Sequence, residues 1–160
     1  MAALNRLVKL RPVSASNDVS ECGPGGWQKV VIPITGLADG AGMATDRSDN
    51  IYISDCDRHV IFKYRKGWNS SIVFAGLLDT PGNADGQGAS ARFNQPGPMC
   101  VDRSGVLWVI DTGNGLVRRV TENGRVFTVA SIPIPAAGDV PGQIVVDDSG
   151  QLFYLDSTGT

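Results

Sequence analysis

The sequence has few residues of the kinds that bind metals or cross-link small proteins. Of its 160 residues, one is histidine and three are cysteine, and the cysteines form no CxxC pair. This pattern favours neither a zinc site nor a disulfide framework, and it predicts reduced, mostly buried thiols. We therefore expect no metal and no other cofactor.

The sequence also lacks an excess of positive charge and a long apolar run. Its formal net charge is −2 and its pI is about 5.2, so a nucleic acid is an unlikely partner. Near the start, Asn5, Arg6, Lys9 and Arg11 interrupt the apolar residues before they reach the length of a signal or membrane segment. We expect a cytoplasmic protein, or one within a virion assembled there, that neither enters a membrane nor is secreted by a signal peptide.

Glycine and proline, in contrast, are plentiful. The chain has 20 glycines and 9 prolines, with 42% hydrophobic and 19% charged residues. These values are typical of a soluble globular protein with many tight turns. We expect one all-β domain over residues 1–160.

An internal repeat refines this fold class. Three ten-residue copies begin at Asp46, Asp102 and Asp147, each with aspartate at both ends, serine third, an aliphatic residue sixth and an aromatic residue seventh. Because the aspartates recur in every copy, we expect them to accept backbone N–H bonds at turns and not to form carboxylate pairs for catalysis. These repeat-structural residues are Asp46, Asp55, Asp102, Asp111, Asp147 and Asp156.

Each repeat has the pattern of a β-hairpin with two further strands. Apolar residues precede the turn, and β-branched and aromatic residues follow it. A further strand is expected upstream at 27–32, 71–75 and 125–130, and another downstream at 59–64 and 115–120. Four antiparallel strands per repeat make a β-propeller blade. The predicted blades span residues 27–66, 69–123 and 125–160.

The middle repeat resembles a known family. The loop at 83–96 reads NADGQGASARFNQP, the hairpin strand at 107–114 reads LWVIDTGN, and Val117–Val120 reads VRRV. Together they are similar to an NHL repeat, with its ADGxGxxARFNxP loop and VDxxGNLYVADTGN hairpin. The resemblance covers about residues 71–121 and is weaker elsewhere. It implies a β-propeller, commonly six-bladed, that acts in most members as an interaction platform.

Three blades are too few to close a ring, since closed propellers typically have about 4 to 8. The third repeat lacks an outer strand, and residues 5–10 align with the outer strand at 59–64. We therefore expect a homodimer with six blades, in which this segment completes the last blade of a sister chain. An open three-blade wedge packed on other proteins is the alternative. The exchanged strand would consist of Asn5, Arg6, Leu7, Val8, Lys9 and Leu10.

The sequence offers little catalytic chemistry. Gly86–Ala91 fits a loose GxGxxA fingerprint, but it lacks the βαβ context that a dinucleotide site needs. The single histidine, His59, cannot form a zinc triad by itself. Partner-binding candidates are the loop residue Trp68 and the arginines Arg92 and Arg118.

These observations favour a non-enzymatic scaffold or protein-binding propeller that self-assembles. Such a protein would suit a larger repetitive assembly such as a virion. Two alternatives remain open. One is a calcium-dependent propeller enzyme similar to the lactonases or lyases, and the other is an RNA-binding platform of the NHL type.

Overall fold

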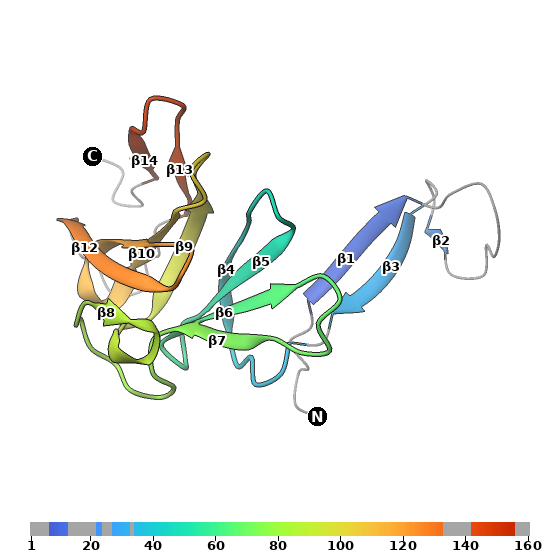
Figure 1. The fold of residues 1–160 in the computed structure, drawn as a ribbon, viewed down its shortest axis with the longest axis horizontal. Helices are drawn as coiled ribbons and strands as arrows, with labels where there is room; N and C mark the ends of the chain where they lie inside the picture. The colour runs from blue at the N-terminus through green and yellow to red at the C-terminus, as the bar shows by residue number, and fades with distance from the viewer. Residues whose placement is uncertain (1–6, 13–21, 24–26, 33, 133–141, 156–160) are drawn as a thin grey trace.

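The structure, a computed structural model, describes residues 7–12, 22–23, 27–32, 34–132 and 142–155. Its regular elements are β-strands, apart from the short 3₁₀ helices η1 (Gly88–Ser90) and η2 (Thr112–Asn114). No helix among the described residues has the length and apolar character needed to span a membrane. The strands form four antiparallel sheets (Figure 1).

Two of these sheets are complete blades. The first has the order β4-β5-β6-β7, and the second has the order β9-β10-β11-β12, with the short β8 added at the outer edge. Sequential strands pair through short turns, as local connections favour. The first blade consists of β4 (Gly40–Thr45), β5 (Asn50–Asp55), β6 (Val60–Arg65) and β7 (Ile72–Ala75). The second consists of β9 (Pro96–Val101), β10 (Leu107–Asp111), β11 (Leu116–Val120), β12 (Arg125–Ser131) and β8 (Gly86–Gln87).

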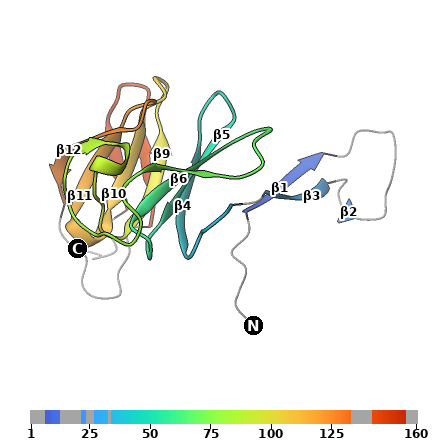
Figure 2. The same ribbon diagram turned by 60° about the horizontal axis from the view of Figure 1, so that its bottom comes forward.

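The other two sheets are smaller. A hairpin of β13 (Ile144–Val146) and β14 (Leu152–Tyr154) follows the second blade. Before the first blade, β1 (Leu7–Pro12), β3 (Trp27–Ile32) and β2 (Cys22–Gly23) form a sheet of order β1-β3-β2. In the views of Figures 1 and 2, this sheet stands apart from the two blades. Strand β13 lies beside β9 (Figure 1).

The blades pack face to face through apolar side chains. Tyr52 and Ile61 of the first blade meet Met99 and Val109 of the second in one buried cluster. The inner strands approach closely, because a Cβ atom on Gly42 would lie 2.5 Å from the carbonyl oxygen of Gly97. A side chain at that position would therefore push the two blades apart.

The predicted blade boundaries are wrong by one strand. The segments 71–75 and 125–130 are predicted to open the second and third blades, but the strands found there, β7 and β12, are outer strands of the sheets that precede those blades. The reason is the length of the connections. Six residues separate β6 from β7, whereas the long loop at 76–95 carries the chain to the next blade. The third predicted blade, 125–160, is therefore a two-stranded hairpin among the described residues.

The predicted exchanged strand also has a partner within its own chain. Leu7 to Leu10 belong to β1, which pairs with β3 in the register Leu7↔Ile32. The edge of β1 opposite β3 has no neighbour among the described strands. Asn5 and Arg6 lie outside the described residues.

Candidate functional site

The aspartates that open the three repeats hold the hairpin turns. In each turn, the carboxylate oxygen Oδ1 accepts hydrogen bonds from two backbone N–H groups. In the first turn, Ser48 and Asn50 donate to Asp46 Oδ1 at 2.9 and 3.0 Å. Asp102 and Asp147 accept the equivalent bonds. These carboxylates act as turn acceptors, as residues at such positions commonly do.

In the first two repeats, the aromatic residue donates a hydrogen bond to the same carboxylate. The Tyr52 hydroxyl donates to Asp46 Oδ2 at 3.0 Å, and the Trp108 indole N–H donates to Asp102 Oδ2 at 2.9 Å. Burial, followed by this contact with Asp46, raises the pKa of Tyr52. The repeated Asp and aromatic pair therefore fixes the side chain that packs between blades.

The aspartates that close the repeats anchor loops. Asp55 is buried and accepts backbone N–H bonds from Ala38, Asp39 and Arg58 at 2.6, 3.2 and 3.1 Å. Asp111 is also buried, but most of its partners are side chains, as described below. Asp156 lies outside the described residues.

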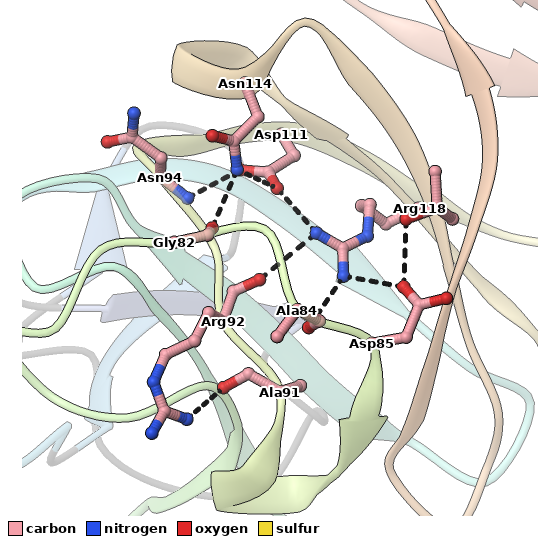
Figure 3. Close-up of polar contacts among 10 residues, drawn as sticks. Gly82, Ala84, Asp85, Ala91, Arg92, Asn94, Asp111, Asn114 and Arg118 are labelled. Carbon is pink, nitrogen blue, oxygen red and sulfur yellow. Dashed lines mark hydrogen bonds and ion pairs between the residues drawn. The ribbon is translucent and has the colours of Figure 1, made fainter.

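Figure 3 shows a group of polar contacts centred on Arg118. The Arg118 side chain is fully buried, and its Nη1 donates to Asp111 Oδ2 at 2.9 Å. Its Nη2 contacts Asp85 Oδ1 at 3.0 Å. The same two nitrogens donate to the backbone carbonyls of Arg92 and Ala84, both at 3.1 Å. The guanidinium thus joins β11 to both ends of the loop motif.

Asp111 also accepts hydrogen bonds from two asparagines. Asn114 Nδ2 donates to Asp111 Oδ2 and to the Gly82 carbonyl, both at 2.8 Å, and the Asn94 N–H donates to Asp111 Oδ1 at 2.7 Å. Burial raises the pKa of Asp111, and the bonds from Asn114, Asn94 and Arg118 oppose that rise. Arg118, Asp111, Asn114 and Asp85 therefore form a clamp that closes the long loop.

Arg118 was predicted to contact a partner, and this prediction is wrong. The sequence placed 115–120 at the outer edge of a blade, where alternate side chains face water. In the structure β12 pairs outside β11, and the loop covers Arg118. Its Cζ also lies 5.2 Å from the centre of the Phe93 ring.

The other two partner-binding candidates occupy loops. Arg92 is half-buried and donates to the carbonyls of Ala89 and Ala91 at 2.6 and 2.7 Å, so it supports its own loop. Trp68 is half-buried in the turn between β6 and β7, where its backbone N–H bonds to Arg65. A binding role for either residue stays a prediction.

A cluster that the sequence did not reveal lies at the end of the first blade. Ligand atoms of Asp39, Cys56 and Asp57 come within 4.8 Å of one another, as the only such group among the described residues. Burial and a hydrogen bond to Asp39 raise the pKa of the Cys56 thiol to about 12. These three residues are therefore possible ligands, and the thiol among them is protonated at neutral pH.

A shallow polar hollow opens between the hairpin turns of the two blades. It has a volume of about 300 Å³, and its exposed charged side chains are Arg47 and Arg103. The two aspartates that line it, Asp46 and Asp102, are engaged in their own turns. A second hollow of about 180 Å³ adjoins it and includes Glu122.

His59 lies outside these hollows. Its backbone has φ = 59°, a left-handed conformation that is uncommon outside glycine but that asparagine, aspartate and histidine adopt more often than other residues. Its Nδ1 accepts the Gln95 N–H at 3.0 Å. The histidine therefore helps to join the first blade to the end of the long loop.

Comparison with known proteins bears on the fold. No family model matches the chain, and no curated protein does. An auxiliary nutrient binding protein from Bacteroides thetaiotaomicron matches with a TM-score of 0.57 and 21% identity, over 70% of this chain and 33% of that one. A gluconolactonase from Xanthomonas campestris matches with a TM-score of 0.56 and 20% identity, over 82% and 39%. Virginiamycin B lyase from Staphylococcus aureus matches with a TM-score of 0.56 and 15% identity, over 84% of this chain and 40% of that one.

The chain thus spans about a third to two fifths of the length of these three proteins. They include a binding protein and two enzymes, so the likeness identifies an architecture and not an activity. The fold of this chain is all-β, and it is that of a partial β-propeller.

Proposed function

We propose that this chain is a non-enzymatic, NHL-type propeller module that assembles with itself and presents its loops to a protein partner. One observation carries the proposal. In the described residues, the side chains that the sequence marked as candidate chemistry are used to hold turns and loops. The clearest case is the Asp111–Arg118 pair, which is buried beneath the loop motif.

The hollow between the turns is the surface that best fits a protein partner. Arg47 and Arg103 are exposed there beside apolar and backbone atoms, and arginine is frequent in protein interfaces. An acidic group of a partner would match the charge of Arg47, since Arg103 already pairs with Asp148. The location that the sequence favours, the cytoplasm or a virion, remains part of the same proposal.

Adding calcium distinguishes this proposal from the alternative that the chain is a calcium-dependent enzyme. Thermal unfolding should be unchanged by millimolar Ca²⁺, because a ligand stabilises a fold only in proportion to its binding. Hydrolysis of lactones and cleavage of streptogramin-type substrates should stay at background. A calcium-dependent rise in Tm of several degrees, or turnover that calcium restores, would contradict a non-enzymatic role.

The RNA-binding alternative has less support from the described residues. Arg118 on β11 is buried. The guanidinium carbons of Arg119 and Arg125 lie over the Phe127 ring, at 5.0 and 5.3 Å from its centre. Retention on single-stranded RNA that weakens steeply with salt would favour it. We expect no such retention.

A further inference from the structure

The three repeats can be compared position by position, with the turn aspartates Asp46, Asp102 and Asp147 as the common frame. Three residues before them stand Met43, Met99 and Ile144, which are 56%, 7% and 3% exposed. This position faces the preceding blade. It is covered in the two repeats that have a blade before them and exposed in the first.

On the opposite face of the three repeats, side-chain exposure increases from the first repeat to the last. Six residues after each turn aspartate stand Tyr52, Trp108 and Phe153. Tyr52 is 1% exposed, Trp108 is half-buried, and Phe153 is 50% exposed. This aromatic position faces the following blade. It is covered where a blade or hairpin follows and open in the last repeat.

The same contact therefore occurs twice within the chain. Met99 packs in one cluster with Tyr52, and Ile144 packs in another with Trp108. A third contact of this kind would need a residue like Met43 and an aromatic like Phe153. The chain has both, at opposite ends of its stack of sheets. Val145, the cross-strand neighbour of Phe153, is exposed on the same side.

One charged position at the turns also differs between the repeats. The residue after each turn aspartate is Arg47, Arg103 or Asp148, and Arg103 pairs with Asp148 of the next repeat. If another repeat packed after β13–β14, the hairpin turn of that repeat would lie beside Asp148. If that repeat were a second copy, Arg47 would meet a carboxylate. An exposed pair of this kind contributes little energy, so it serves to select the partner.

We propose that a second copy of this chain packs the front of its first blade, at Met43, onto the back of β13–β14, at Phe153 and Val145. The contact is head-to-tail, and two copies that close on each other use it twice. This inference rests on the proposed self-assembly and names the faces that carry it.

The strand order supports the same arrangement. β13–β14 supplies two strands, whereas each complete blade has at least four. In the first blade, β6 pairs antiparallel with β7, with a register shift after the pair Ile61↔Ala75, and β1 pairs antiparallel with β3 from the pair Leu7↔Ile32 without a shift. The β1–β3 pair thus matches the outer half of a blade. Beside β14 of another copy, it would give the order β13-β14-β1-β3, which repeats β4-β5-β6-β7.

Two substitutions of opposite charge test this interface. Met43→Glu and Phe153→Lys should each weaken self-association at least tenfold, as measured by light scattering over a range of concentrations. Mixing the two variants should restore dimers, since the mixed pair has one Glu–Lys contact and one unaltered contact. Both positions are exposed in the single chain, so circular dichroism should show an unchanged fold.

A matched control is available on the first blade. Ile72 is 48% exposed and pairs with Lys63, whose Nζ lies over the Tyr52 ring, on the side already turned to the second blade. Ile72→Glu and Ile72→Lys should leave the mass unchanged. Dimers that survive Met43→Glu or Phe153→Lys, or a mixture that stays dissociated, would overturn the named faces while leaving self-assembly intact. An unaltered chain that stays monomeric would overturn both this inference and the self-assembly.

Discussion

The two complete blades differ in how they provide hydrogen-bond donors to the aspartate that ends their second strand. Asp55 in the first blade and Asp111 in the second are equivalent, and both are buried. Asp55 takes its hydrogen bonds from three backbone N–H groups. Asp111 is paired with Arg118, whereas Phe62 occupies the corresponding position of the first blade.

This difference follows the length of the loop that each carboxylate must hold. The loop before the second blade, 76–95, is long, and Arg118 reaches its carbonyls at Ala84 and Arg92 as well as the Asp85 carboxylate. Backbone N–H groups suffice at Asp55. The repeated element is therefore the carboxylate, and the arginine is added where a longer loop needs to be closed.

The largest expected effect comes from removing the arginine. Arg118→Met leaves Asp111 buried without its cation, which typically costs about 3–5 kcal/mol of unfolding free energy. The matched change, Phe62→Met, conserves apolar character and should cost less than about 1.5 kcal/mol. Urea unfolding of both variants measures the two values. Equal losses of unfolding free energy in the two variants would contradict a stabilising role for the Asp111–Arg118 ion pair.

A smaller difference is expected between the two aspartates themselves. Asp55→Asn loses one of its acceptor oxygens and should destabilise the protein by about 1–3 kcal/mol. Asp111→Asn should cost more, because it also leaves the buried Arg118 with the half-exposed Asp85 as its remaining carboxylate. Chemical unfolding at neutral pH ranks the two. The reverse order would contradict the account of the clamp.

The repeat itself, including its hairpin strands and their turns, could be predicted from the sequence. Which sheet each outer strand joins could not, because Ile72–Ala75 and Arg125–Ser131 have the same apolar pattern whether they open a blade or close one. Arg118 was misplaced for the same reason, since its exposure depends on whether β12 lies outside β11. The open faces at Met43 and Phe153 have ordinary repeat residues, so only their exposure in the structure reveals them.

The pH dependence of stability should reflect the turn carboxylates. Burial alone would raise the pKa of Asp46, but the hydrogen bonds from Asn50, Tyr52 and Ser48 lower it overall. A depressed pKa in the folded state stabilises the fold above the unfolded value, near about 3.9, and this stability is lost as pH falls through the folded value. Asp46→Asn should flatten the acid limb of the unfolding curve. An unchanged pH profile would contradict this assignment.

The smallest effect is expected at the outer end of the clamp. The Asp85 side chain is about half exposed, and Thr128 Oγ1 also donates to it at 2.9 Å. Burial alone would raise its pKa, but the bonds from Thr128 and the charge of Arg118 lower it overall. Because water screens the pair, Asp85→Asn should cost less than about 1 kcal/mol. A loss as large as that of Arg118→Met would place the centre of the clamp at Asp85 and not at Asp111.

The most direct test of the whole account is the native mass of the unaltered chain in solution. Two copies should associate through the exposed faces at Met43 and Phe153, giving twice the chain mass of 16.9 kDa over a range of concentrations. A single chain mass at every concentration would contradict this account, because those two faces would then be left open or be covered by something other than this chain.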